Sequence, residues 1–302
     1  MIREDPGFYK KLLDSMSDGV FFVDRERQIL YWNEGALRLT GYTSEELIGK
    51  HCQDEILCHV DLLGKRLCSA GCPLSACIKD GGVHKATVFL QHKQGRRVPV
   101  QVCVEPMRAA DGSIVGAIQI FSDNSAAMEA QRKIDEMKRM AFFDYMTGLP
   151  NRRFLEMTLN TALNEYEVHH ELFAAMIVDL DKFKEINDTF GHASGDLALE
   201  QVAQILVGSL RPTDIVGRWG GDEFLAIVRN VDGVIARILA ERCISLVTGS
   251  KVICLDSKVI PLSISIGATL VHPGDDIRSL LDRADQQLYQ SKLNGRGRAS
   301  ID

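Results

Sequence analysis

Two glycines followed by two carboxylic acids, near the middle of the second half of the chain, have the types and spacing of a ligand site. In "GRWGGDEFLAIV", residues 217–228, Gly220 and Gly221 directly precede Asp222 and Glu223 within an otherwise apolar stretch. Glycines permit a tight turn and the close approach of a bulky ligand. Adjacent carboxylates repel each other unless a cation or a proton donor lies between them. The stretch therefore predicts a hairpin tip that holds a metal ion and a ligand.

A third carboxylate completes the expected cation site. Asp179 closes the apolar run "FAAMIVD". If that strand lies beside the hairpin, Asp179, Asp222 and Glu223 converge at one edge of the sheet. Three carboxylates without a nearby His or Cys indicate a hard cation, Mg²⁺ or Mn²⁺, which is often shared with substrate phosphates. The alternative is a solvated acidic turn, and the flanking glycines and apolar strands argue against it.

Phosphates also need basic partners. Lys184 follows the strand that ends at Asp179, and Lys292 and Arg296 lie in "QSKLNGRGR" near the C-terminus. They could neutralise phosphates, but basic residues at the end of a helix are often simply partners of the helix dipole.

The elements that must position these residues follow an α-β-α-β-β-α-β-α order from Asp144 onward. We expect a helix near Pro150, a strand ending at Asp179, a helix from about Ser194, the hairpin, a helix over 231–247, the strand "ISIGATL" and a final helix "SLLDRADQQLYQSKL". A split βαββαβ core of this kind places its central strands side by side.

The first 122 residues are predicted as a separate mixed α/β domain. Strands are expected over Val20–Val23 and Ile29–Trp32, and a short helix with a capping box begins at Thr43 or Ser44. Three more strand-like runs are "HKATVFLQHK", "RRVPVQVCVEPM" and "IVGAIQIFSD". The pattern predicts a five-stranded antiparallel sheet with a helical flank.

Residues 123–143 lack Gly and Pro and contain many helix formers. Their apolar residues recur at alternating three- and four-residue spacing: Ala127, Ala130, Ile134, Met137 and Ala141. Because the segment bridges two domains, we expect a parallel coiled coil that joins two chains. The alternative is one amphipathic helix packed on its own domain.

Composition limits the class of protein. The 302 residues suggest two domains, and 45% hydrophobic with 25% charged residues is ordinary for a soluble protein. A net charge of −6 without a long basic block argues against a duplex nucleic-acid binder. With no bilayer-length apolar run and no apolar signal core at the N-terminus, we expect a cytoplasmic protein without a membrane partner.

Five of the eight cysteines are concentrated in residues 51–77, in the spacing C-x5-C-x9-C-x3-C-x4-C. They are Cys52, Cys58, Cys68, Cys72 and Cys77, with His51 and His59 in the same segment. Four of the thiols could bind an iron–sulfur cluster or Zn²⁺. A thiol–disulfide switch, a plain cysteine-rich loop, and haem bound through one of the histidines remain alternatives.

The second half of the chain resembles the GGDEF family of diguanylate cyclases. Besides "GGDEF", the motifs that carry the resemblance are "DYMTGLPNRR", "VDLDKFKEINDTFGHASGD", "SISIGAT" and "ADQQLYQSKLNGRGR". They cover roughly residues 140–300, and the domain is assigned to 144–302. Met146 stands where the family usually has Leu. The resemblance implies a palm-like cyclase fold that condenses two GTP into cyclic di-GMP.

The same resemblance implies metal and catalytic roles. Mg²⁺ or Mn²⁺ would be bound by Asp179, the backbone carbonyl of Leu180, and Asp222. Glu223 would support a second metal ion or help to activate the attacking hydroxyl, and Lys184 would assist at the triphosphate.

It also implies the substrate contacts. Asn187 and Asp196 would hold the guanine, since a carboxylate can accept from both N1–H and the exocyclic amino group. His192 would lie near the base or ribose, or would serve only as a structural residue of the loop. The turn and triphosphate contacts would come from Gly220, Gly221, Lys184, Lys292 and Arg296.

Two further implications concern regulation. Each domain would bind one GTP, so synthesis would require two domains face to face in a homodimer. In "RPTD", Arg211 and Asp214 lie upstream of the glycines at the offset of the family's inhibitory product site. The simpler interpretation of this string is a helix end stopped by Pro212.

The first domain resembles PAS sensory domains through "SDGVFFVDRERQILYWNEGALRLTGYTSEELIGK" and "RAADGSIVGAIQIFSD". The whole is therefore interpreted as a diguanylate cyclase regulated by its PAS domain. The competing hypotheses are a catalytically silent receptor of cyclic di-GMP, and a metal or redox sensor with the cyclase as its output.

Overall fold

The computed structural model of the chain describes residues 6–52, 54, 56–68, 71–253 and 259–302. Contacts divide the chain into two compact units, residues 1–134 and 135–302. The division falls within one helix, α5 (Ser125–Phe142). The expected boundaries at 122 and 143 stay a prediction, and each unit is described by itself.

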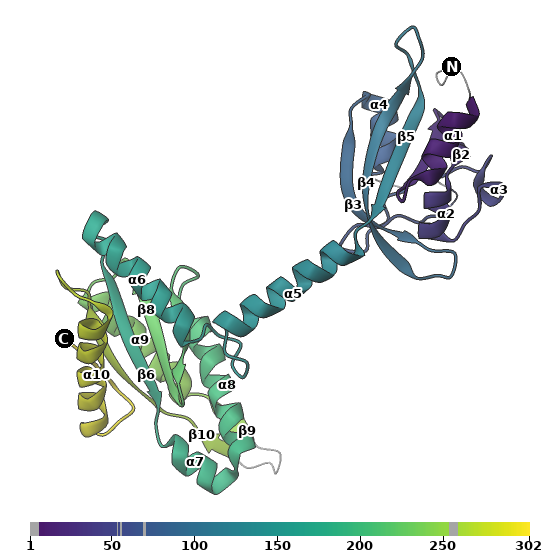
Figure 1. Ribbon diagram of the computed structural model, residues 1–302. Coiled ribbons are helices and arrows are strands. Elements are labelled where there is room, and N and C mark those ends of the chain that lie inside the picture. Colours follow the sequence, from purple (N-terminus) through teal and green to yellow (C-terminus); the bar gives the residue numbers. More distant parts are fainter. Residues whose placement is uncertain (1–5, 53, 55, 69–70, 254–258) are drawn as a thin grey trace. The chain divides into compact units, whose positions relative to one another are not determined.

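The N-terminal unit is built on a five-stranded antiparallel sheet, as predicted (Figure 1). Its strand order is β2-β1-β5-β4-β3. The elements along the chain are α1 (Pro6–Ser15), β1 (Gly19–Asp24), β2 (Ile29–Trp32), α2 (Glu34–Thr40), α3 (Ser44–Leu47), α4 (Pro73–Asp80), β3 (His84–Gln91), β4 (Arg97–Arg108) and β5 (Ile114–Asp123).

Local sequence explains these elements. Alternate residues of β4 are buried, which is the period-two pattern of a strand with one face on the core. Thr43 and Glu46 form the predicted capping box of α3. The helix α4 starts at Pro73, a residue suited to the first turn, and ends before Gly81 with φ +70°. The helix α1 was not predicted.

Helix α5 confirms the helix expected over residues 123–143. None of its residues is buried. Among its apolar side chains, Ile134 is 46% exposed, Met137 66% and Met140 80%. The seam residues Ile134 and Met137 are thus exposed, and Met140 beside them extends the apolar surface.

The C-terminal unit has twelve elements within the described residues (Figure 1). They are α6 (Arg152–His169), β6 (Phe173–Leu180), α7 (Phe183–Phe190), α8 (His192–Ser209), β7 (Ile215–Gly220), β8 (Glu223–Arg229), α9 (Gly233–Thr248), β9 (Lys251–Ile253), β10 (Val259–Pro261), β11 (Ile264–Leu270), α10 (Ile277–Leu293) and β12 (Ala299–Ile301). The predicted order is confirmed except for α7, β9, β10 and β12, which are additional.

The main sheet has the order β12-β11-β6-β8-β7, so the predicted central strands are neighbours. Every residue of β6 is buried, because helices cover both faces of the sheet. Met176 and Val178 belong to the core cluster with α8 and α9, whereas Ala175 and Ile177 belong to the cluster with α6 and α10. Strand alternation therefore places Asp179 on the face of α6 and α10.

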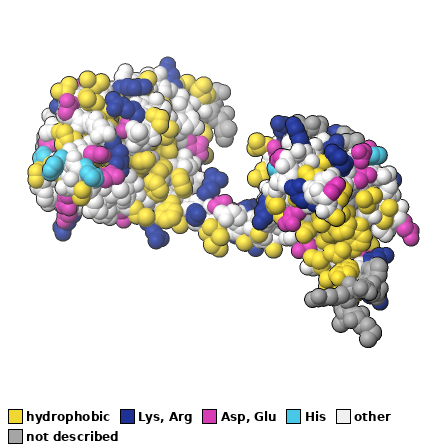
Figure 2. All heavy atoms as spheres, turned by 90° about the horizontal axis from the view of Figure 1, so that it is seen from above, with side chains coloured by type: hydrophobic (Ala, Val, Ile, Leu, Met, Phe, Trp, Pro, Cys, Tyr) yellow, Lys and Arg dark blue, Asp and Glu magenta, His cyan; other side chains and the backbone are white. Residues whose placement is uncertain are grey.

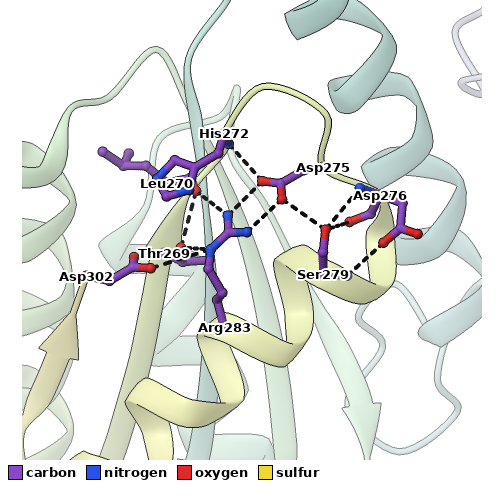
Figure 3. Close-up of polar contacts among 8 residues, drawn as sticks. All are labelled: Thr269, Leu270, His272, Asp275, Asp276, Ser279, Arg283 and Asp302. Atoms are coloured by element: carbon purple, nitrogen blue, oxygen red, sulfur yellow. Dashed lines mark hydrogen bonds and ion pairs between the residues drawn. The ribbon is translucent and has the colours of Figure 1, made fainter.

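A polar network fixes the start of α10 against the end of β11 (Figure 3). Arg283 donates from both terminal nitrogens to Asp275, at 2.6 and 2.7 Å, and also to the backbone oxygen of Leu270 at 2.9 Å. Asp276 caps the helix through the backbone nitrogen of Ser279 at 2.7 Å. The network holds the helix whose other end carries Lys292.

On the face shown in Figure 2, basic and acidic side chains are interspersed over both units, consistent with the small net charge. Within the described residues, no helix has the length and apolar character to cross a membrane.

Candidate active site

The end of β6 and the hairpin between β7 and β8 meet as the sequence predicts. Asp179 on β6 lies directly opposite Glu223 on β8 in the antiparallel register. The backbone nitrogen of Leu180 donates to the backbone oxygen of Asp222 at 3.2 Å. The strand end and the acidic turn are thus joined, and three carboxylic acids belong to one edge of the sheet.

Lys292, from the last turn of α10, is the cation of this group. Its Nζ lies 2.7 Å from Oδ2 of Asp179. The Asp179 side chain is 10% exposed and that of Lys292 33% exposed. The sequence predicted Lys292 as a phosphate ligand but not this ion pair with a metal-site carboxylate.

The carboxylates are held in an environment that penalises their charge. Burial raises the pKa of Asp179 above its usual value, and the neighbouring Asp222 and Asp181 add to this, although Lys292 opposes it. Burial and the charge of Asp179 likewise raise the pKa of Glu223. A bound cation would relieve both penalties.

The donor set is appropriate for Mg²⁺, since carboxylates and a backbone carbonyl are hard oxygen ligands. In the described part of the chain, however, no three His, Cys, Asp or Glu side chains stand close enough together to hold an ion. Lys292 is the counter-charge of Asp179 in this arrangement.

The glycine turn is open. A Cβ atom placed on Gly220 or Gly221 would meet no atom within 4 Å. Gly221 has φ +52°, in the left-handed region where glycine is favoured. The turn therefore leaves space for a ligand beside the carboxylates.

Two residues without a predicted role support this turn. The guanidinium of Arg218 donates to the backbone oxygen of Gly221 at 2.7 and 3.0 Å, and lies 3.3 Å from a carboxylate oxygen of Asp144. Asp144 also accepts from the backbone nitrogen of Thr147 at 2.9 Å. The first acid of "DYMTGLPNRR" thus anchors the hairpin, and the only sequence signal was its place within that motif.

The expected guanine-binding residues lie on α7 and α8. Asn187 is half-buried on α7, and a Cβ on Gly195 of α8 would fall 2.0 Å from its Oδ1, so glycine permits this close approach. Asp196, the residue after Gly195, is half-buried. His192 is the first residue of α8 and is exposed. Lys184 is exposed on the first turn of α7.

Asp181 connects the end of β6 to the loop that carries Arg296. It is 6% exposed and accepts from the hydroxyls of Ser263 and Ser265 at 2.6 and 2.7 Å. It also accepts from the backbone nitrogen of Gly297 at 3.2 Å, next to the exposed Arg296. Sequence reasoning gave Asp181 no role.

The R-x-x-D pair has an exposed and a buried member. The carboxylate of Asp214 accepts from the backbone nitrogens of Arg211 at 2.9 Å and Arg229 at 3.2 Å. Arg211 itself is exposed. Asp214 therefore shapes the turn that presents Arg211.

In the N-terminal unit, the six cysteines within the described residues are free thiols. Cys52 and Cys72 line one small cavity together with His59, whereas Cys77 is buried in α4 outside that lining. Positions 53, 55, 69 and 70 of the cysteine-rich segment 51–77 lie outside the described residues.

The comparison with protein families decides the assignment. The description "Diguanylate cyclase, GGDEF domain" matches residues 141–298, more than half of the chain. The chain belongs to the GGDEF diguanylate cyclase family. A PAS domain matches residues 17–126, so a PAS domain precedes the GGDEF domain, as the sequence predicts.

Curated relatives agree. The chain is 30% identical to the probable diguanylate cyclase DgcE of Escherichia coli over 96% of its own length, but it spans 26% of that protein. It is 36% identical to diguanylate cyclase A of Treponema denticola, of which it spans 46%. It is 30% identical to diguanylate cyclase DgcM of Escherichia coli, covering 98% of this chain and 69% of that one.

Solved structures support the fold of the GGDEF domain. The coiled coil and GGDEF domain of DgcB from Caulobacter crescentus, solved in complex with c-di-GMP, matches 59% of this chain and 95% of that one, with 27% identity and a TM-score of 0.56. Diguanylate cyclase SiaD of Pseudomonas aeruginosa, solved with its activator SiaC, matches 59% of this chain and 69% of that one, with 30% identity and a TM-score of 0.53.

Proposed function

We propose that this chain is a diguanylate cyclase, which condenses two GTP into cyclic di-GMP and releases two pyrophosphates. The observation that carries the proposal is the placement of Asp179 directly opposite Glu223, beside a glycine turn with open space around it. Relatives named as diguanylate cyclases support the same substrate class.

In the proposed reaction, the 3′-oxygen of one GTP attacks the α-phosphorus of the other, and pyrophosphate leaves. Asp179, Asp222 and the backbone oxygen of Leu180 would hold Mg²⁺, which supplies charge neutralisation for the triphosphate. Glu223 would accept the proton of the 3′-hydroxyl, and its raised pKa makes it a better base than an ordinary carboxylate. Support of a second metal ion is the alternative role for Glu223.

The remaining residues would bind the substrate. Asp196 would accept from the N1–H and the exocyclic amino group of the guanine, Asn187 would hold the same base, and His192 would lie close to the base or ribose. The exposed Lys184 and Arg296 would contact the triphosphate. Lys292 would contact it as well while remaining paired with Asp179.

A homodimer would bring two such sites face to face. Helix α5 exposes Ile134, Met137 and Met140, and none of its residues is buried in the single chain. We propose that a second copy covers this face as a coiled coil. The PAS domain would regulate the output through the same helix, and cyclic di-GMP would inhibit by binding at Arg211 and Asp214.

The decisive experiment is incubation of the purified chain with GTP and Mg²⁺, followed by chromatography of the products. We expect cyclic di-GMP and pyrophosphate from the wild type, none from Asp222→Ala, and normal amounts from Glu241→Ala, which removes an exposed carboxylate of α9. Both variants should retain the circular dichroism of the wild type. If the wild type bound cyclic di-GMP but made none, the chain would be a receptor and the proposal would be wrong.

A further inference from the structure

The PAS domain encloses a small cavity next to its cysteine-rich segment. The lining residues are Cys52, His59, Leu67, Cys72, Pro73, Val88, Val102 and Gln119. The cavity volume is about 10 Å³, which accommodates one particle of the size of a water molecule or a metal ion. Haem, a flavin or an iron–sulfur cluster would not fit without extensive rearrangement.

One polar atom at this cavity lacks a partner. His59 is 7% exposed, and its Nε2 has no hydrogen-bond partner among the described residues. A buried donor or acceptor without a partner is destabilising, so proteins rarely retain one without a reason. Burial lowers the pKa of His59 to about 4, so the imidazole is neutral at physiological pH. The unpaired nitrogen indicates a ligand.

The thiols around it belong to the cysteine-rich segment 51–77. Cys52 is 5% exposed and follows the isolated bridge between Gln28 and His51. Cys72 is half-buried at the N-cap of α4, where its side chain makes no capping hydrogen bond and so is not committed to the helix. Cys68 is a third, half-buried thiol of the segment, and its sulfur accepts a hydrogen bond from the backbone of His59.

We propose that His59, Cys52 and Cys72 form a binding site for a single thiophilic transition-metal ion of the Zn²⁺ class, with Cys68 as the fourth ligand. An imidazole nitrogen with two or three thiolates is the donor set that such ions prefer. A disulfide between Cys52 and Cys72 would account for the thiols but would leave Nε2 of His59 unpaired. Metal binding accounts for both observations.

The described residues do not yet form a coordination sphere, because no three candidate ligands among them are close enough together to hold an ion. Binding would therefore turn the thiols toward Nε2 and release their protons. Cys72 is the N-cap of α4 and Cys52 belongs to the PAS core, so the ion would tie the start of α4 to that core. The site would couple metal availability to the packing of the sensory domain.

The test uses the full chain, reduced, treated with a chelator and titrated with Co²⁺ alone under anaerobic conditions. We expect one Co²⁺ per chain with thiolate-to-cobalt charge-transfer absorption, which the oxygen ligands of the GGDEF domain cannot produce. His59→Ala and Cys72→Ser should weaken this binding at least tenfold. Cys103→Ser, which removes another half-buried thiol of the same domain, should leave it unchanged.

A second measurement needs no variant and so does not depend on how the variants fold. Zn²⁺ should protect Cys72 from alkylation in the wild type while Cys103 continues to react, as read by mass spectrometry of the peptides. If the wild type shows no charge-transfer absorption and Zn²⁺ leaves alkylation of Cys72 unchanged, the cavity holds water only and the proposal is overturned. Equal loss of the absorption in Cys103→Ser would also overturn it.

Discussion

The ammonium of Lys292 and the carboxylate of Asp179 are 2.7 Å apart, which ties the last turn of α10 to the end of β6. The two residues are separated by more than a hundred positions, yet they form the charged centre of the proposed active site. In the free protein, Lys292 neutralises a carboxylate that burial would otherwise protonate more readily. We propose that, with GTP bound, the same ammonium also neutralises phosphate charge.

Replacement of Lys292 should therefore weaken catalysis more than folding. We expect Lys292→Met to lower kcat/KM for GTP at least tenfold, since a charge-assisted contact is typically worth about 1.5–3 kcal/mol. Lys292→Arg should retain part of the activity. Lys251→Met, which changes an exposed residue of β9, is the matched control and should leave kcat/KM unchanged. Equal activity of Lys292→Met and the wild type at low GTP would contradict this role.

The charge of Glu223 should lower the stability of the folded chain although catalysis requires it. Its pKa is raised in the folded chain, so the folded state loses stability as pH rises through that pKa and remains less stable above it. Glu223→Gln removes the charge, and at pH 7 without Mg²⁺ we expect the unfolding midpoint to rise by on the order of 2 °C. In the assay with GTP and Mg²⁺, we expect cyclic di-GMP synthesis to fall at least a hundredfold.

Mg²⁺ provides the check on this interpretation. It should raise the unfolding midpoint of the wild type more than that of Glu223→Gln, because the ion relieves the carboxylate repulsion only where the charge is present. Glu241→Gln should behave as the wild type in both measurements. A lower midpoint for Glu223→Gln would mean that the carboxylate stabilises the fold, contrary to the argument.

Arg218 should act on catalysis through the hairpin. Because it binds the backbone oxygen of Gly221 and pairs with Asp144, Arg218→Ala should misplace the acidic turn and reduce kcat about 10- to 100-fold. Asp144→Asn should have a smaller effect of the same kind. The double variant should lose less than the sum of the single losses in free energy, since both act on one contact. Additive losses would show that the two residues act separately.

Much of this site could be predicted because its signals are local. The apolar run that ends at Asp179 and the glycines before Asp222 identify a strand and a turn without any tertiary information. The order of elements then predicts that these strands are neighbours, and the register of Asp179 with Glu223 confirms it.

The remaining features depend on contacts between distant segments. Nothing near Lys292 or Arg218 in the sequence indicates that they pair with Asp179 and Asp144. The strands β9, β10 and β12 have three residues each, too few for a periodic pattern to be recognised. Helix α7 is short and polar, so the sequence pattern does not distinguish it from a loop before α8.

The R-x-x-D pair should separate product inhibition from folding. Arg211 is exposed, and Arg211→Ala should therefore weaken inhibition by added cyclic di-GMP at least tenfold without changing initial rates or stability. Asp214 accepts two backbone hydrogen bonds, so Asp214→Ala should also destabilise the chain by about 1–3 kcal/mol. Inhibition that is unchanged in Arg211→Ala would exclude this site.

Asp275 and Arg283 should set the acid stability of α10. Burial alone would raise the pKa of Asp275, but hydrogen bonds from Arg283, the backbone of His272 and Ser279 outweigh it and lower the pKa to about 2. A lowered folded-state pKa gives stability that is present above the unfolded value near 4 and is lost as pH falls toward 2. The contribution is about 2 kcal/mol at neutral pH.

Asp275→Asn should therefore cost about 2 kcal/mol at pH 7 and much less near pH 2, as measured by hydrogen exchange of the α10 amides, which reports on this helix separately from the PAS domain. The matched control is Asp282→Asn, whose carboxylate is 65% exposed beside Arg278 and should change the free energy of opening by less than about 0.5 kcal/mol. A cost for Asp275→Asn that did not diminish with falling pH would mean that hydrogen-bond geometry, not the charge of Asp275, holds the start of α10.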